Sequence, residues 1–168
     1  LKEVYFPESL KELNGSSGFY KTYLEKITGP NVLEDNRSLV IDGQLAYVAP
    51  AGLSEYVTPA GVKVLNQQVL ADKPSLEKIT LSDDVEEVAG YGYLLEKNPN
   101  LKSVTLSARL RHLGYDPFGT NDNDYSNNIE SIYIRSKYPP TVIYNNPLVM
   151  HPLAKATIYV QETQVDRY

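Results

Sequence analysis

Two histidines, His112 and His151, are the side chains of this sequence best suited to proton transfer near neutral pH. A serine nucleophile would need one of them as its base. His112 lies in "RLRHL" beside Leu113, and His151 precedes Pro152 in "VMHPLAK". No glycine-rich phosphate loop and no spacing typical of metal ligands accompanies either one. We therefore predict no catalytic residues and no cofactor, and we do not expect an enzyme.

Carboxylates occur in pairs, at Asp83 and Asp84 and at Glu86 and Glu87, and again in the polar segment "GTNDNDYSNN". In that segment Asp122, Asp124 and Ser126 alternate as the ligands of a calcium loop do. No glycine follows Ser126, however, and Tyr133 stands where the last glutamate of such a loop belongs. The sequence favours a solvated loop over 120–128, with calcium as the alternative, and predicts no metal site.

Composition limits the other classes of function. The chain has 168 residues, 42% of them hydrophobic, and a net charge of -5, so it offers no basic patch for nucleic acid. It has no cysteine and therefore no disulfide, and no apolar run long enough to cross a bilayer. The first residue is Leu1 and no signal-like segment follows, which indicates a trimmed piece of a longer product.

An internal repeat organises most of these residues. The segment "PSLEKITLSDDVEEV" from Pro74 is followed 25 positions later by "PNLKSVTLSARLRHL" from Pro99, with the same spacing of apolar residues. The template continues along the chain, with repeats that start near residues 1, 24, 53, 76, 101, 129 and 153. A period between 20 and 30 residues is typical of a solenoid, so we predict one domain over 1–168.

Within each repeat the second and third apolar positions are two apart, as in Val104 and Leu106. In a strand both side chains point to one face, so stacked repeats form a parallel sheet of short strands with a shared core. The later apolar pair, such as Leu110 and Leu113, closes the far wall. Charged residues between these positions are expected to contact only water, which would leave them free to vary between repeats.

One longer repeat contains "NRSLVIDGQLAYVAP", two apolar runs joined by Asp42 and Gly43. Asp-Gly favours a two-residue turn, so we predict a β-hairpin near 39–48 that projects from the coil. At the ends of the chain, Leu1 already occupies the first position of a repeat, whereas "QETQVDRY" is polar enough to act as a cap. An uncapped first strand predicts that more repeats or another domain precede Leu1.

The repeats resemble the BspA-like leucine-rich repeats of bacterial cell-surface proteins, whose unit is approximately L-x-x-I-x-I-P-x-x-V-x-x-I-x-x-x-x-F. The segment "LKEVYFPESLKEL" fits it with Pro7, and "TPAGVKVL" keeps Pro59 and Gly61. The unit's final apolar or aromatic position is occupied by Leu70, Tyr93 and Phe118. Four residues depart from the pattern: Gly29, Pro30, Thr58 and Ser82.

This resemblance implies an α/β leucine-rich-repeat solenoid dominated by β-structure, forming the C-terminal part of a longer chain. It further implies export to the bacterial surface and adhesion to a host extracellular protein or glycan. The alternative is a passive scaffold or spacer for another domain. No nucleic acid partner is expected, and the sequence gives no prediction of oligomeric state.

The binding hypothesis points to the outward side chains of the strands. One predicted row alternates in charge and then becomes mostly neutral: Glu3, Lys26, Glu55, Lys78, Ser103, Ser131 and Lys155. The next row is uncharged and includes Val57 together with the candidate binding residues Tyr5, Thr28, Thr80, Thr105, Tyr133 and Thr157. Tyrosine offers an apolar ring with a polar tip, which suits recognition of protein or glycan. Alternatively, Thr and Tyr are present only because both favour strands.

Overall fold

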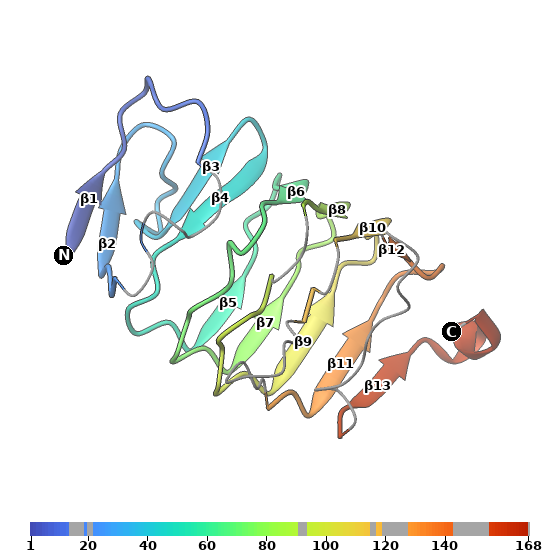
Figure 1. Ribbon diagram of the computed structural model, residues 1–168. Helices are drawn as coiled ribbons and strands as arrows, with labels where there is room; N and C mark the ends of the chain where they lie inside the picture. Colours follow the sequence, from blue (N-terminus) through green and yellow to red (C-terminus); the bar gives the residue numbers. More distant parts are fainter. Residues whose placement is uncertain are drawn as a thin grey trace.

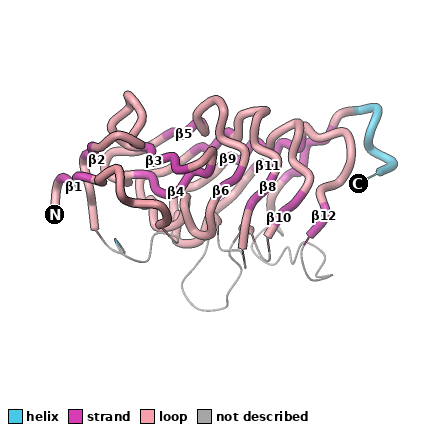
Figure 2. Tube along the Cα trace, turned by 90° about the horizontal axis from the view of Figure 1, so that it is seen from above, coloured by secondary structure: helices cyan, strands magenta, loops and turns pink. Residues whose placement is uncertain are grey.

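The chain winds into a β-solenoid of short, mostly parallel strands (Figure 1). The computed structural model describes residues 1–13, 19, 22–90, 94–114, 117–118, 128–142 and 155–167. Their strands form three sheets, which confirms the predicted parallel repeat solenoid. Seen from above, the successive turns of the solenoid follow one another along a single axis (Figure 2).

The first wall of the solenoid is a five-stranded parallel sheet in the order β13-β11-β9-β7-β5. Its strands are β5 (Glu55–Val57), β7 (Lys78–Thr80), β9 (Ser103–Leu106), β11 (Ser131–Ile134) and β13 (Thr157–Val160). Each is short because it supplies only one or two inward apolar side chains before the chain turns toward the opposite wall.

The second wall is also a sheet, six-stranded and ordered β12-β10-β8-β6-β4-β3. Its strands are β3 (Ser38–Ile41), β4 (Gln44–Val48), β6 (Val64–Leu65), β8 (Glu87–Val88), β10 (His112–Leu113) and β12 (Thr141–Val142). A separate parallel pair, β1 (Glu3–Tyr5) and β2 (Lys26–Thr28), lies at the N-terminal end, and a 3-10 helix, η2 (Glu162–Arg167), at the C-terminal end.

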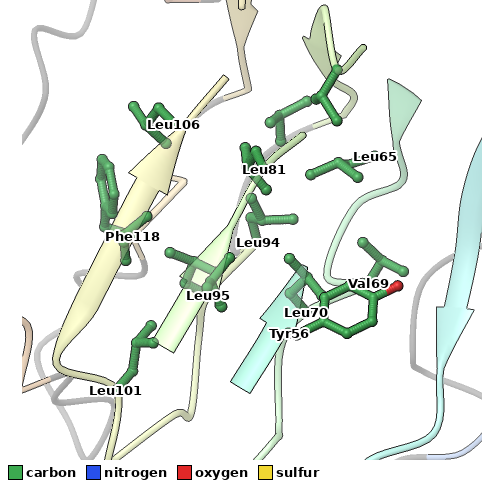
Figure 3. Close-up of a cluster of buried hydrophobic side chains, with 14 of the residues drawn as sticks. Tyr56, Leu65, Val69, Leu70, Leu81, Leu94, Leu95, Leu101, Leu106 and Phe118 are labelled. Atoms are coloured by element: carbon green, nitrogen blue, oxygen red, sulfur yellow. The ribbon is translucent and has the colours of Figure 1, made fainter. Parts of the chain in front are cut away.

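The main core fills the space between the two walls. Inward residues of the first wall and of the second wall belong to one buried cluster, with Tyr56, Ile79, Val104 and Ile132 from one side and Leu45, Leu65, Val88 and Leu113 from the other. Side chains of the connecting turns, including Leu70, Leu94, Leu95 and Phe118, complete it (Figure 3). The apolar template therefore marks the core, as the repeat predicts.

The hairpin of β3 and β4 is present but does not project. Its strands pair in antiparallel fashion around Asp42 and Gly43, and β4 then pairs in parallel with β6 as part of the second wall. Side chains on both faces of β4 are buried, because Leu45 enters the main core and Tyr47 enters a second core with Phe6, Leu24, Ile27 and Leu39. The prediction of a projecting hairpin is wrong: the hairpin separates the two cores.

The α/β expectation also needs correction. No α-helix occurs among the described residues, and the far wall that Leu110 and Leu113 were expected to close is a sheet, parallel except for the β3–β4 pair. Within this part of the chain, no helix is long and apolar enough to cross a membrane. Because the second wall is a sheet and the described residues form no α-helix, the structure is β-dominated to a greater degree than the sequence predicts.

Two of the departures from the repeat pattern are resolved by local packing. Buried Thr58 stands at an inward position, and its hydroxyl lies 3.2 Å from the Ser82 hydroxyl and accepts the Ser82 backbone N–H at 2.7 Å. Gly29, with φ of 139°, faces Phe6: a Cβ there would lie 2.0 Å from the Phe6 carbonyl oxygen. A polar pair and a close backbone contact replace the usual aliphatic packing.

The charged residues between the apolar positions were expected to contact only water. This expectation is wrong for Asp83 and Asp84, which also contact neighbouring turns. The Asp83 carboxylate accepts the backbone N–H of Ala108 at 3.0 Å, and the Asp84 carboxylate accepts that of Gly61 at 2.9 Å. These contacts join Asp83 to the following turn of the solenoid and Asp84 to the preceding one. The acidic pair therefore helps to hold successive turns in register.

Candidate functional site

The outward face of the five-stranded sheet carries a row of uncharged side chains in register. Backbone pairing aligns Val57 with Thr80, Thr80 with Thr105, and Thr105 with Tyr133. The last member of the row is Tyr159, which pairs with Tyr133. We call this row the tyrosine face. It consists of Val57, Thr80, Thr105, Tyr133 and Tyr159.

Three of the predicted candidates lie elsewhere. Tyr5 and Thr28 pair with each other in the separate two-stranded sheet, so the single predicted row is divided into two. Thr157 pairs with Ser131, two residues before the position of Tyr159. The predicted position of Thr157 in the row is therefore wrong, while its role in binding stays a prediction. The sequence left the register open because Ala156 with Ile158 and Ile158 with Val160 both satisfy the apolar spacing. The matching strings "SIYI" and "TIYV" were the signal that could have identified Tyr159.

The two tyrosines form a stacked pair at the C-terminal end of the face. Their ring centroids lie 4.6 Å apart with an interplanar angle of 10°, and Tyr133 is 40% exposed and Tyr159 47%. Such a separation matches the spacing of neighbouring strands, so the pair is a direct consequence of the register. Both tyrosines are thus partly open to solvent, and Thr105 lies beside them on the adjoining strand.

Charge is unevenly distributed along the neighbouring row. Glu55 and Lys78 form an ion pair at 3.7 Å on β5 and β7, as Glu3 and Lys26 do at 3.3 Å on β1 and β2. Both pairs are exposed, so each contributes at most about 1 kcal/mol. Beyond Lys78 the row continues with Ser103, Ser131 and Thr157, which are all neutral. The flank of the stack that this row forms is therefore polar and uncharged, whereas Arg135 lies on the other flank, two residues after Tyr133.

Arg135, which follows β11, ties the ends of three strands together. Its Nε donates to the Leu106 carbonyl at 3.1 Å, and its Nη2 donates to the Leu81 carbonyl at 2.7 Å. The same Nη2 lies 3.0 Å from the Asp83 carboxylate. Because these contacts span three turns of the solenoid, they fix the relative positions of β7, β9 and β11 next to the tyrosine face.

No protein family and no curated protein compared with the chain matches it. A leucine-rich cell-surface protein from Faecalibacterium prausnitzii is 14% identical with a TM-score of 0.56, over 99% of this chain and 50% of that one. The shared feature is the fold. The pneumococcal vaccine antigen PcpA is 17% identical with a TM-score of 0.39, over 99% and 52% of the two chains. This chain spans about half the length of each structure.

The candidates for chemistry are not brought together. His112 is exposed on β10, where its Nδ1 lies 2.6 Å from the Thr141 hydroxyl, which itself donates to the Arg111 carbonyl at 3.1 Å. His151 and the calcium candidates Asp122, Asp124 and Ser126 lie outside the described residues. Within the described ranges, no group of three or more His, Cys, Asp or Glu side chains is arranged to hold a metal ion.

A buried lysine lies where the two cores meet, a feature that the sequence analysis missed. Lys73 is 2% exposed; its Nζ donates to the Ala71 carbonyl at 2.8 Å and lies 5.6 Å from the centre of the Tyr47 ring. Burial lowers the pKa of Lys73 to about 8, although the Asp72 carboxylate acts in the opposite direction. Burial likewise raises the pKa of Tyr47 to about 12. None of these groups lies on the tyrosine face.

Proposed function

We propose that this protein is a non-catalytic cell-surface leucine-rich-repeat protein of the BspA-like type that binds a host protein or glycan through its tyrosine face. The repeat spacing and the fold shared with a leucine-rich cell-surface protein support the class. Export and attachment to a host surface are parts of the same proposal. The observation that carries the binding role is the exposed Tyr133–Tyr159 stack beside the neutral row of Ser103, Ser131 and Thr157.

The physical basis is that such a surface loses little conformational entropy when it binds a ligand. A tyrosine side chain has few rotatable bonds, and stacking already restricts both rings in the free protein. A ligand that covers the ring edges therefore gains apolar contact and hydrogen bonds to the two hydroxyls with little loss of conformational entropy. The neighbouring Thr105 and Ser131 hydroxyls add polar contacts without the cost of removing a charge from water.

The test is capture of extracellular-matrix proteins and mucin glycans by the immobilised chain. We expect the Tyr133→Ala/Tyr159→Ala variant to lose at least tenfold in affinity for whatever the parent captures, which corresponds to about 1.4 kcal/mol. Tyr23→Ala is the matched control, because Tyr23 is also an exposed tyrosine but lies outside the sheets. Circular dichroism verifies the fold of each variant.

Two outcomes would contradict the proposal. Equal capture by the parent and by the double variant would place binding on another surface. Capture by neither, over the whole panel, would favour the passive scaffold or spacer, which has no ligand to lose. Catalysis is a separate question, and turnover of a captured substrate that His112→Ala abolishes would replace binding by enzymatic function.

A further inference from the structure

A groove lies on the side of the solenoid away from the tyrosine face. It runs between residues 11–13 of the N-terminal segment and the outer surface of the second wall, and its volume is about 760 Å³. The wall contributes residues of β4 and the turns that follow β6 and β8. Leu45 and Leu65 point from these strands into the main core, so the groove is separated from the tyrosine face by the thickness of the solenoid. Its volume is typical of a site for a small ligand.

Amide side chains dominate the groove: Gln44, Asn66, Gln67 and Gln68. Asn66 is used structurally, because its Nδ2 donates to the Leu13 carbonyl at 3.3 Å and so holds the N-terminal segment against the wall. The side-chain amides of Gln44 and Gln67 make no hydrogen bond to any residue that the structure describes. Each offers a donor and an acceptor to a ligand in the groove.

The position of Gln67 depends on a glycine in the next turn of the solenoid. Gly90 has a φ of 82°, and a Cβ at this position would lie 2.9 Å from Gln67 Oε1 and 3.0 Å from Gln67 Cβ. Only glycine combines this backbone conformation with room for the glutamine side chain. Small residues Ala46 and Ala89 also line the groove. The hollow over the wall therefore follows from small side chains in adjacent turns.

Charge argues for an uncharged ligand. The described lining includes one cationic side chain, Lys11, and two carboxylates, Glu12 and Asp42. Because charges of both signs line the groove, neither an anionic nor a cationic ligand meets only complementary charge. A hydroxyl group of a ligand can donate to the carbonyl oxygen of a side-chain amide and can accept from its NH2 group. Leu13 is only partly buried and can cover the C–H face of a sugar ring, whereas Ile41 belongs to the second core.

We propose that this groove binds a short neutral oligosaccharide, recognised by the side-chain amides of Gln44 and Gln67. The site is independent of the tyrosine face, so the proposal does not rest on the function assigned to that face. It would give the protein a second binding surface in addition to the tyrosine face.

The experiment uses the whole chain with neutral oligosaccharides of two to four units: maltotriose, chitotriose and lacto-N-tetraose. Binding is followed by nuclear magnetic resonance, through the side-chain amide signals of Gln44 and Gln67, and by calorimetry. We expect at least one probe to shift both signals. Gln44→Ala/Gln67→Ala should weaken that probe at least tenfold, and Gly90→Ala should weaken it by displacing Gln67.

Controls separate this site from the tyrosine face. Tyr133→Ala/Tyr159→Ala should bind the same probe as tightly as the parent, whatever becomes of its macromolecular ligand. Sialyllactose, which is anionic, should bind no more tightly than the neutral probes. The proposal is overturned if no neutral probe shifts the two amide signals at millimolar concentration, or if binding survives the double glutamine substitution. Tighter binding of sialyllactose, or shifts caused only by short peptides, would overturn it equally.

Discussion

Lys73 gives the sharpest quantitative prediction, because a lysine buried to this extent must resist protonation in the folded state. Its pKa of about 8 lies below the ordinary lysine value of 10.5, and the main cause is loss of contact with water. Between these two values the unfolded chain binds a proton that the folded protein does not. Stability must therefore rise with pH across this interval.

The magnitude follows from the difference between 10.5 and about 8. At 1.36 kcal/mol for each pH unit, the complete effect is about 3 kcal/mol, and about 2.5 kcal/mol of it should develop between pH 7 and pH 10. Measurements should stop at pH 10. Above that value unfolded tyrosines lose their protons while buried Tyr47, whose pKa is about 12, keeps its own, so stability falls again.

The assay compares urea unfolding of the parent and of Lys73→Met at pH 7, 8, 9 and 10. Methionine has a similar length and no charge, so the stability of Lys73→Met relative to the parent should decline by about 2.5 kcal/mol from pH 7 to pH 10. Lys102→Met is the matched control for loss of a lysine, since Lys102 is exposed. A pH-independent difference for Lys73→Met would refute the argument, because it would mean that Lys73 is protonated alike in the folded and unfolded chains.

Two further substitutions test how the turns of the solenoid are joined. Buried Asn98 accepts the Lys73 backbone N–H and donates to the carbonyls of Leu70 and Leu95, at 2.8 to 3.0 Å. Asn98→Ala should lower the free energy of unfolding by about 3 kcal/mol in urea titrations, against about 1 kcal/mol or less for exposed Asn100→Ala; equal losses would contradict this. Gly29→Ala should separate β1 from β2, because its Cβ would collide with the Phe6 carbonyl, whereas Gly52→Ala, with open space around it, should cost far less. The Phe6 amide donates to the Thr28 carbonyl at 2.7 Å, so its hydrogen exchange measures the separation of β1 from β2 in Gly29→Ala. Unchanged protection of this amide would contradict the prediction.

The sequence predicted those parts of the fold in which every repeat must bury an apolar side chain at the same position. An inward apolar residue is needed in every turn of the first wall, so Ile79, Val104 and Ile132 recur at the same position of successive repeats, and all three are buried. The outward candidates Thr80, Thr105 and Tyr133 follow from the same register, and the structure does place them side by side. Whether they bind a ligand stays a prediction.

Other features could not be predicted because they depend on contacts between turns. The strands of the second wall are mostly two residues long, too short to show any alternation of apolar residues. The hairpin carries apolar residues toward two different cores, so its pattern did not reveal which face was exposed. Lys73 and Asn98 each precede a proline, 25 residues apart, and only the structure shows that both side chains are buried.

The contacts between turns also bear on where a ligand could be recognised. Asp83, Asp84 and Arg135 vary from repeat to repeat, yet each is engaged by a neighbouring turn and is therefore constrained by it. A residue that holds the solenoid together has little freedom to adapt to a ligand. Tyr133 and Tyr159 contact each other but remain 40% and 47% exposed, and Gln44 and Gln67 make no hydrogen bond within the described structure. Because neither pair holds adjacent turns together by hydrogen bonds, substitutions there should change binding before they change stability.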